Sequence, residues 1–394
     1  MVGENMRTTQ FKPPRDIPYS LMSISSFAGV NFAVPPSQIA DNECSDISNF
    51  EITQTGRLRK RLGYELVVDN LTTDSINGMY LYKDKFLVAI GTKLYNLKTD
   101  DTLELLYSSL NNHKTTFFTM NGKLYILDGT NYLQYDGIEF KKVQDIAYVP
   151  TLYVAAQPAT GVNDTNTMNE PINLLSPSFK VSYSADGTTK TYKLGIENLD
   201  ATLVKAWINN VEKVEVTDFT VDRVKGEVTF LSAPEKGTDN VIIQAFKTNT
   251  GYADRINKCT LAISYGGLND THIILSGNPD SPAVVFRGGA MDPTYFSDLD
   301  YQAVGETDEP VTGFTIQYDS LVIFKNKSIW HMAFELTDKG AKYPVRPLNG
   351  AYGCINPNTI ELIENAPFFL DRRGVYILTQ SNVREEKNIA LMSE

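Results

Sequence analysis

Short apolar runs alternate with tight polar turns along most of this chain, and one such unit is repeated. Residues 83–97 have the sequence KDKFLVAIGTKLYNL, and residues 121–135 have the sequence NGKLYILDGTNYLQY. The two segments align without a gap, so that Gly91 pairs with Gly129. Each segment is an apolar strand, a turn and a second strand that ends near an aromatic residue. The pattern therefore predicts a repeated β-hairpin.

Two further copies of this hairpin occur downstream. Residues 319–332, DSLVIFKNKSIWHM, form one copy, and residues 367–378, PFFLDRRGVYIL, form a shorter one. Hairpins that recur at a period of roughly 40 residues are typical of β-propeller blades. A propeller is more often a scaffold than a reaction centre, so the repeat favours a binding or structural role.

The hydrophobic pattern divides the chain into four parts. The pattern predicts an N-terminal arm, a short helix that begins near Pro36 and a hairpin within residues 1–72. It predicts the first propeller blades within residues 73–148. Residues 149–256 begin with a stretch rich in Pro, Asn, Thr and Gly, which is typical of a domain boundary. They continue with strands joined by Asp-Gly, Asn-Asn and Lys-Gly turns, which predict an inserted antiparallel β-sandwich. Residues 257–394 supply the remaining blades.

The predicted fold class is therefore all-β: a β-propeller with an inserted antiparallel β-sandwich domain. Four hairpins are clear and one or two blades are weaker. The propeller is either incomplete in this chain or closed by its N-terminal strands. Tyr and Phe number 21 and 19 among the 394 residues, which supports β structure because broad side chains fit a pleated surface.

Charge argues against a nucleic-acid binder. The formal net charge is −11, whereas DNA-binding domains carry a basic patch that neutralises phosphates. One basic cluster lies at residues 57–61, and a solvated hairpin end explains it better than a DNA-binding patch does. An acidic channel surface could still surround DNA, because it would repel the phosphates and let the duplex slide through without binding.

Candidate chemistry is sparse. The chain has three cysteines far apart, which indicates reduced thiols rather than a disulfide framework or a zinc site. Its three histidines, His113, His272 and His331, have no second His or Cys at ligand spacing. There is no P-loop, no G-x-S-x-G and no H-E-x-x-H. We expect no catalytic residue, no metal site and no cofactor, and so a protein that is not an enzyme.

An acidic stretch is the strongest remaining candidate for a site. It contains Asp298, Asp300, Glu306, Asp308 and Glu309. Paired carboxylates could hydrolyse a glycoside, and converging carboxylates could bind calcium. A solvated or interface loop is the simpler interpretation. If the protein surrounds a DNA channel, these five residues are the candidate acidic loop that faces it.

The N-terminal block from Phe27 to Glu65 carries a recognisable phrase. It has a GGVN-like opening, a P-x-x-I/L-x-D-x-E segment, a following N-F/V and a G-x-L-R-x-R-x-G-Y hairpin. The residues of the phrase are Gly29, Val30, Asn31, Pro36, Ile39, Asp41, Glu43, Asn49, Phe50, Gly56, Leu58, Arg59, Arg61, Gly63 and Tyr64. Together with LSGNPDSPAVVFRGGAMDPTYF and FKNKSIWHM, the block resembles the propeller-bearing virion proteins of tailed phages. These include the packaged-DNA stabilisation proteins and tail-nozzle proteins of short-tailed phages.

The resemblance implies a structural protein of the phage tail or head–tail connector. Such a protein forms a homo-oligomeric ring, which we expect to be hexameric, and it retains the genome until ejection. Its partners would be copies of itself and adjacent tail or connector proteins, while genome DNA passes without specific binding. Its location would be the virion, after synthesis in the host cytoplasm. The candidate oligomer contacts are Phe27, Asn31, Arg57, Arg59 and Arg61.

Two other functions stay open at this point. The chain could be a tail-tip receptor- or carbohydrate-binding protein that contacts a host surface glycan through the insert. Exposed aromatic side chains on the insert's loops would favour that alternative. It could also be a glycan-cleaving propeller enzyme, and two carboxylates that converge in a central pocket would favour that one.

Overall fold

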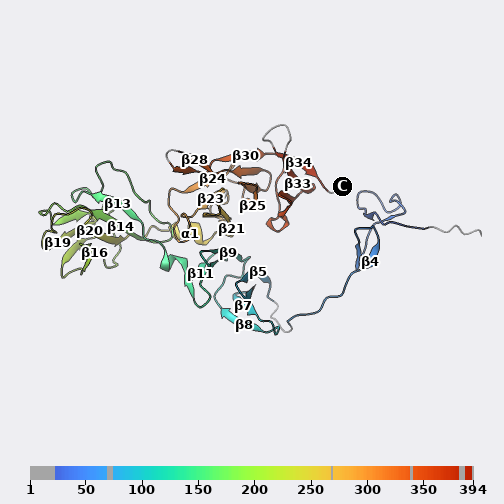
Figure 1. The fold of residues 1–394 in the computed structure, drawn as a ribbon, viewed down its shortest axis with the longest axis horizontal. Helices are drawn as coiled ribbons and strands as arrows, with labels where there is room; N and C mark the ends of the chain where they lie inside the picture. The colour runs from blue at the N-terminus through green and yellow to red at the C-terminus, as the bar shows by residue number, and fades with distance from the viewer. Residues whose placement is uncertain (1–22, 69–73, 268, 338–339, 381–386, 393–394) are drawn as a thin grey trace, which may run out of the picture. The chain divides into compact units, whose positions relative to one another are not determined.

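The computed structural model describes residues 23–68, 74–267, 269–337, 340–380 and 387–392, and the predicted arm at 1–22 lies outside them. The chain forms two compact units, Met1–Val67 and Val68–Glu394. Its described part is nearly all β (Figure 1). The exceptions are one α-helix, α1 (Tyr252–Asn257), and two 3₁₀ turns, η1 (Val143–Ile146) and η2 (Pro357–Thr359).

The first unit contains two pairs of short strands. β1 (Gly29–Val30) pairs in parallel with β2 (Glu43–Cys44), and β3 (Phe50–Ile52) pairs antiparallel with β4 (Leu58–Lys60) across a turn at Gly56. The helix predicted near Pro36 does not form, and the chain makes turns there instead. The Glu43 carboxylate accepts hydrogen bonds from the Asn31 side chain and the Ala40 N–H, so side-chain bonds replace helical ones.

The second unit contains five four-stranded antiparallel sheets, each with its strands in chain order. The first sheet comprises β5 (Ile76–Tyr82), β6 (Lys85–Ile90), β7 (Lys93–Leu97) and β8 (Leu103–Tyr107). The second comprises β9 (Thr116–Met120), β10 (Lys123–Leu127), β11 (Tyr132–Tyr135) and β12 (Phe140–Lys142). The third comprises β21 (Leu261–Tyr265), β22 (His272–Ser276), β23 (Val284–Arg287) and β24 (Tyr301–Ala303).

The last two sheets follow the same plan. The fourth comprises β25 (Val311–Gln317), β26 (Ser320–Lys325), β27 (Ile329–Met332) and β30 (Val345–Asn349). A small hairpin of β28 (Glu335–Thr337) and β29 (Gly340–Lys342) interrupts it. The fifth comprises β31 (Glu361–Ile363), β32 (Ala366–Asp371), β33 (Gly374–Gln380) and β34 (Lys387–Leu391).

The sequence repeat corresponds to the second and third strands of a sheet. Lys85 and Lys123 each open a second strand. Gly91 and Gly129 lie in the following turns with φ of 56° and 81°, a left-handed conformation that favours glycine. The downstream copies are the β26–β27 and β32–β33 hairpins.

Consecutive sheets pack on one another through apolar side chains. Leu87 and Leu94 of the first sheet share a buried cluster with Leu124 and Ile126 of the second. Similar clusters join the second sheet to the third, the third to the fourth and the fourth to the fifth. Each internal sheet is therefore buried on both faces.

Residues 151–246 form two further sheets around a core of their own. The larger sheet has the order β13 (Thr151–Ala156), β14 (Ser178–Tyr183), β20 (Val241–Phe246), β16 (Lys205–Ile208) and β17 (Val211–Lys213). The smaller has the order β15 (Thr191–Lys193), β19 (Glu227–Phe230) and β18 (Phe219–Asp222). The β13–β14 pair is parallel, which departs from the purely antiparallel prediction.

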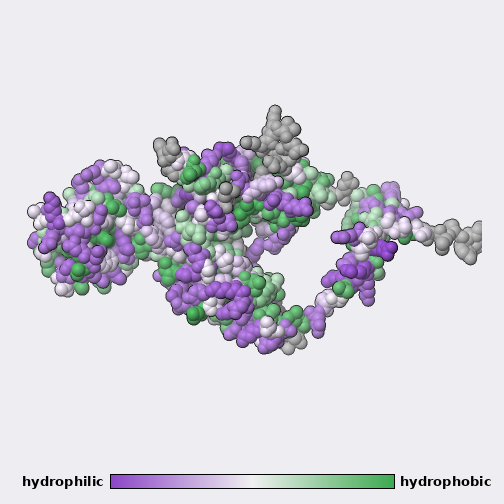
Figure 2. Space-filling view, viewed as in Figure 1, coloured by the Kyte–Doolittle hydropathy of each residue, from purple (hydrophilic) through white to green (hydrophobic). Residues whose placement is uncertain are grey.

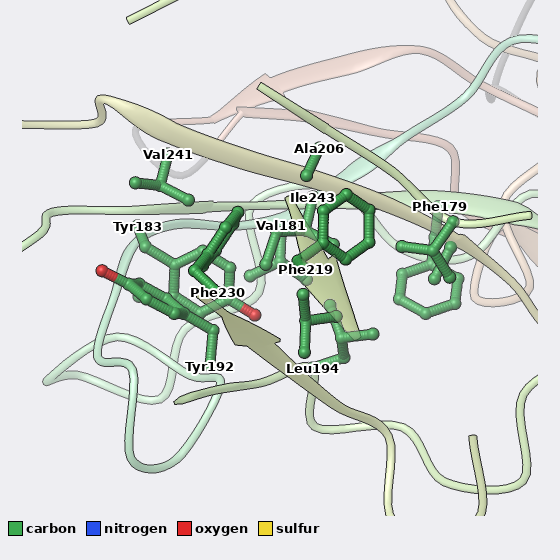
Figure 3. Packing of buried hydrophobic residues seen from close by; sticks show 14 of the residues in the cluster. Phe179, Val181, Tyr183, Tyr192, Leu194, Ala206, Phe219, Phe230, Val241 and Ile243 are labelled. Atoms are coloured by element: carbon green, nitrogen blue, oxygen red, sulfur yellow. The ribbon is translucent and has the colours of Figure 1, made fainter. Parts of the chain in front are cut away.

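Aromatic side chains from both sheets fill this core (Figure 3). The Tyr192 ring packs edge-on against Tyr183 at 5.1 Å and against Phe230 at 5.5 Å between centroids. The residues of this cluster all come from the segment between Leu152 and Ala245. The segment therefore folds around its own hydrophobic side chains.

Residues 173–175, in the middle of this segment, pack against the four-stranded sheets. Leu174 and Leu175 belong to the core between the second and third sheets. The Asn173 side chain donates to the Tyr148 and Thr294 carbonyls, both at 2.9 Å, and accepts from the Phe296 N–H at 3.1 Å. The predicted insert at 149–256 thus includes a short stretch that is built into the host sheets.

Candidate functional site

A cavity of about 630 Å³ lies where the first strands of the sheets converge. Its lining residues are Ile76, Asn77, Gly78, Met79, Tyr80, Lys114, Thr115, Thr116, Phe117, Leu261, Ala262, Gly313, Phe314, Pro357 and Asn358. They come from β5, β9, β21 and β25 and from η2, which directly precedes β31. The first strands of four sheets, the two residues before β9 and the turn before β31 therefore line one cavity.

Two glycines permit the close approach of strands at this cavity. A Cβ atom at Gly78 would lie 2.6 Å from the Thr115 carbonyl oxygen of the neighbouring sheet. A Cβ atom at Gly313 would lie 2.4 Å from Cδ1 of Ile360. A larger residue at Gly78 would push the first strand away from the Thr115 backbone, whereas one at Gly313 would displace the end of the Ile360 side chain.

Lys114 is the one charged side chain among the lining residues. Its Nζ donates to Oδ1 of Asn358 at 2.7 Å, which links the second sheet to the fifth. Burial lowers the pKa of Lys114. No carboxylate is among the described residues that line the cavity.

None of the five acidic residues proposed to face a channel lines this cavity, and two of them lie beside basic side chains. Asp300 accepts a hydrogen bond from Arg287 at 2.5 Å. Glu309 accepts from the Ser328 hydroxyl at 2.9 Å and lies 3.7 Å from Nζ of Lys325. Lys325 is fully buried and donates to the backbone carbonyls of Val304 and Glu306.

The other acidic residues of this group have separate surroundings. Burial raises the pKa of Asp298, whose backbone N–H donates to the Ile172 carbonyl at 3.0 Å. The Glu306 and Asp308 side chains are exposed. The five residues thus do not converge on one point, and their predicted orientation toward a channel stays a prediction.

The predicted oligomer contacts all lie in the first unit. The Phe27 N–H donates to the Gly56 carbonyl at 2.6 Å, and Asn31 donates to Glu43 at 2.8 Å. Arg59 forms an ion pair with Glu51, and the Arg61 guanidinium lies 5.7 Å from the Tyr64 ring centroid. Arg57 forms no ion pair within the described residues.

The first sheet carries an apolar outer face, a feature that motif analysis missed. Side chains alternate along each strand, so the residues opposite the second sheet fall on one surface. This surface, here called the first-sheet outer face, consists of Ile76, Met79, Leu81, Phe86, Val88, Ile90, Tyr95, Leu97, Leu103 and Leu105, with Lys93 at one end. Leu81 is 65% exposed and Leu105 is 51% exposed, whereas Val88 and Ile90 are buried. Figure 2 shows hydrophobic and hydrophilic residues side by side on the surface of the second unit.

The fifth sheet has an outer surface that is partly covered. Phe369, Tyr376 and Leu378 point into the core shared with the fourth sheet. The alternate positions Phe368 and Ile377 are only half-buried. In the sequence, such a face is indicated by a strand that is apolar on both sides, so that the outward-facing positions are apolar as well. Met79 and Leu81, and Phe86, Val88 and Ile90, are outward-facing positions of this kind.

A second cavity, of about 340 Å³, lies between the third and fourth sheets. The Arg287 guanidinium lies 4.2 Å from the Tyr343 ring centroid and pairs with Asp300, and all three residues line the cavity. Glu335 and Lys342 also line it, so both signs of charge are present. The Arg287–Tyr343 contact links the third sheet to the segment that precedes β30.

His272 lies beside this cavity and makes the region sensitive to pH. Its Nδ1 lies 2.9 Å from the Thr271 hydroxyl and 3.0 Å from the Tyr343 hydroxyl. Burial and the Arg287 charge lower the pKa of His272 below 6.5, against a smaller opposing effect of Asp300. The unfolded chain therefore binds more protons just below pH 6.5, and stability falls as the pH falls through that window.

We expect acidification from pH 7.5 to pH 5 to lower the melting temperature less in His272→Gln than in the unchanged protein. The substitution removes the group that must be protonated at a cost in the folded state. Thermal unfolding across this pH range measures the effect. His113→Gln, at an exposed position, is the matched control and should keep the original slope. Equal slopes for His272→Gln and the unchanged protein would contradict the assignment.

Neither a metal cluster nor a membrane helix is found in the part of the chain that the structure describes. No three His, Cys, Asp or Glu side chains there gather closely enough to hold a metal ion. No helix among those residues has the length and hydropathy needed to cross a membrane.

Comparisons with known proteins add little. No protein-family model matches the sequence, and no curated protein matches it. A candidate 6-phosphogluconolactonase of Bacteroides fragilis aligns with 85% of this chain and 86% of its own, at 11% identity and a TM-score of 0.30. The extracellular domain of a one-component system of B. thetaiotaomicron aligns with 82% of this chain and 44% of its own, at 10% identity and a TM-score of 0.24.

A third similar structure is PorZ, a surface component of the type-IX secretion system of Porphyromonas gingivalis. It aligns with 82% of this chain and 39% of its own, at 12% identity and a TM-score of 0.22. The chain thus spans less than half the length of the last two proteins. At these TM-scores the likenesses carry no argument about function.

Proposed function

We propose that this protein is a non-enzymatic structural subunit of a phage particle. It belongs to the tail or head–tail connector, as part of a homo-oligomeric ring that retains the genome and releases it. Its five four-stranded sheets are the blades of a β-propeller, and residues 151–246 are an inserted β-sandwich. The N-terminal phrase and the hairpin repeat support this proposal.

The observation that carries the proposal is the pair of apolar outer sheet faces. Ten apolar positions share the first-sheet outer face. Ile76, Met79, Leu81, Phe86 and Leu105 among them are exposed, whereas Val88 and Ile90 are buried, and the fifth sheet adds the half-buried Phe368 and Ile377. Soluble monomers rarely leave contiguous apolar surfaces of this kind open to water. Such surfaces favour a protein that functions in contact with others.

The convergence of strands supports the propeller assignment. In a propeller, the first strand of each blade lines a central channel and the blade faces pack on their neighbours. Here the first strands of four sheets and the turn before β31 line one cavity, and four apolar clusters join consecutive sheets. This arrangement is the one expected of successive blades.

The two alternatives receive less support. The shared cavity has no carboxylate among its described lining residues, whereas a glycan-cleaving enzyme needs two. The large exposed apolar side chains of the insert are aliphatic, whereas a sugar platform needs aromatic ones. They are Val154, Met168, Leu203, Val211, Val214, Val216, Val224 and Leu231.

Sedimentation velocity and cryo-electron microscopy of the purified full chain test the assembly. We expect a closed ring of several copies, and we expect the same chain in particles made by the phage that encodes it. A protein that stays monomeric at concentrations of about 100 µM, well above common association constants, would overturn the proposal.

We also expect no measurable binding of a 30-base-pair DNA duplex by the isolated chain at ~0.15 M salt. The net charge is −11, and the shared cavity presents one lysine, so few phosphates could be neutralised. Fluorescence anisotropy with a labelled duplex measures this. Micromolar, salt-sensitive binding that disappears in an Arg57→Ala, Lys60→Ala double variant would contradict it and assign the basic hairpin to DNA.

A further inference from the structure

The second cavity, between the third and fourth sheets, lies where both sheets depart from the common plan. Residues 288–300 connect β23 to β24, whereas residues 98–102 are enough to connect β7 to β8 of the first sheet. The fourth sheet carries the additional β28–β29 hairpin between β27 and β30. Asp300 of the long connection and Glu335 and Lys342 of the hairpin line the cavity together. Binding residues occur preferentially on such added connections, which a rigid scaffold positions.

The lining of the second cavity combines apolar side chains with an accessible aromatic ring. Ile274, Val285 and Met332 are buried at the cavity. Tyr301 also lines it and is 45% exposed. The Arg255 guanidinium lies 4.5 Å from the centroid of the Tyr301 ring, a cation–π contact that holds this ring in place. The cavity volume of about 340 Å³ is sufficient for a small molecule, since such sites span ~300–1,000 Å³.

The charges that line the second cavity balance one another. The two cationic lining residues are Arg287 and Lys342, and the two carboxylates are Asp300 and Glu335. Asp300 forms an ion pair with Arg287, and Glu335 forms one with Arg346 at 3.0 Å. A ligand of high net charge of either sign would therefore meet like charges in this lining. The balance favours a ligand without net charge.

The Arg287–Asp300 pair retains hydrogen-bonding groups that its own contact does not use. Nη2 of Arg287 donates to Oδ1 of Asp300 at 2.5 Å, and the Arg287 side chain makes no other hydrogen bond within the described residues. A guanidinium has five N–H donors, and a carboxylate accepts at both oxygens. A hydroxyl group can therefore accept from Arg287 and donate to Oδ2 of Asp300 while the ion pair stays intact. A charged ligand group would instead compete for one member of the pair.

We propose that the second cavity binds a neutral saccharide of one or two rings. Its hydroxyl groups, which both donate and accept, bond the Arg287–Asp300 pair, and the apolar C–H face of a sugar ring packs on Tyr301. Lys342 and Glu335 supply a further donor and acceptor at the hairpin. This binding function goes beyond the proposed structural role. It does not depend on ring assembly, because all of these residues belong to one chain.

Ligand-observed NMR of the full chain tests the class of ligand. Saturation-transfer difference spectra are recorded with glucose, galactose, mannose, N-acetylglucosamine, maltose and lactose. Glucuronate serves as the anionic probe and glycine as the zwitterionic probe. We expect at least one neutral sugar to bind with a Kd on the order of 1–10 mM. Failure of all six sugars to bind at about 50 mM, or binding by the charged probes alone, would overturn the inference.

Two substitutions then locate the bound sugar. Tyr301→Ala and Asp300→Asn should each weaken binding roughly 10-fold, because one removes the ring contact and the other a charge-assisted hydrogen bond. The matched controls are Tyr318→Ala, at a position 59% exposed, and Asp280→Asn, in an exposed ion pair with Lys258. Neither control position lines the cavity, so both controls should bind as the unchanged protein does.

Circular dichroism verifies that each variant is folded. Folded Tyr301→Ala and Asp300→Asn proteins with unchanged affinity would overturn the inference, since the sugar would then occupy another place. The bound sugar is also coupled to serum albumin, and capture of this conjugate would assign the cavity to the ends of surface glycans rather than to free sugar. A monomer that binds the sugar would overturn the proposed ring and leave this inference standing, whereas a ring that binds none would do the reverse.

Discussion

Replacement of Lys325 by methionine is expected to lower the free energy of unfolding by about 3 kcal/mol, because it removes the cation from a fully buried network. The Lys325 ammonium group donates to the carbonyls of Val304 at 2.5 Å and Glu306 at 2.7 Å, and Glu309 lies 3.7 Å away. Methionine fills the same volume but donates nothing. Two carbonyls therefore lose their donor in an apolar setting, and the Glu309 carboxylate loses the nearby cation while it keeps its hydrogen bonds from the Lys327 N–H and the Ser328 hydroxyl. Urea denaturation of the intact chain measures the loss.

Two further variants make the result specific. Lys327→Met removes a nearby exposed ammonium group and should change stability by no more than ~0.5 kcal/mol. Glu309→Gln combined with Lys325→Met removes both charges, so the double variant should be more stable than Lys325→Met alone. A Lys325→Met protein as stable as the Lys327→Met control would show that the buried network contributes little.

Replacement of Gly226 by alanine is expected to destabilise residues 151–246 by about 3 kcal/mol. Gly226 has a φ of 65° in the turn between β18 and β19, and an added Cβ would lie 1.9 Å from the Ile196 carbonyl oxygen. The left-handed backbone costs alanine ~1–2 kcal/mol, and the displaced carbonyl adds ~1–3 kcal/mol of overpacking. Hydrogen exchange measured by mass spectrometry locates the effect.

Gly122→Ala separates the two contributions. Gly122 has a φ of 71° in the turn between β9 and β10, and an added Cβ there would meet no other atom within 4 Å. Its replacement should cost only the backbone strain, about 1 kcal/mol. Increased exchange in β15, β18 and β19 alone after Gly226→Ala would show that the segment unfolds independently of the four-stranded sheets. Uniform exchange throughout the second unit would contradict that independence.

The repeated hairpins were predictable because their cause is local. Gly91 and Gly129 mark the same turn in two sheets, and apolar runs on either side are short enough to be strands. The third sheet was harder to recognise, since the connection from β22 to β23 is a longer loop and breaks the pattern. The helix expected near Pro36 was wrong, because Glu43 satisfies the local backbone and side-chain donors that a helix would otherwise bond.

The acidic stretch shows the limit of spacing as a guide to a site. Asp300 and Glu309 are close in sequence, yet one pairs with Arg287 and the other lies beside Lys325. Those cations lie in β23 and β26, and no local sequence pattern predicts that they lie beside these carboxylates. Likewise, Lys114 and Asn358 are 244 positions apart and meet at the shared cavity.

The sequence by itself determined that the chain is β-rich, that a hairpin recurs, and that a segment of different composition interrupts the recurrence. These properties depend on turn chemistry and on side-chain alternation, which act over a few residues. Only the tertiary structure decided which faces are covered. Leu81 and Leu87 lie in adjacent strands and look equally apolar, but Leu87 is buried against the second sheet and Leu81 is exposed. Burial depends on contacts between distant segments, and those contacts are fixed only when the sheets pack.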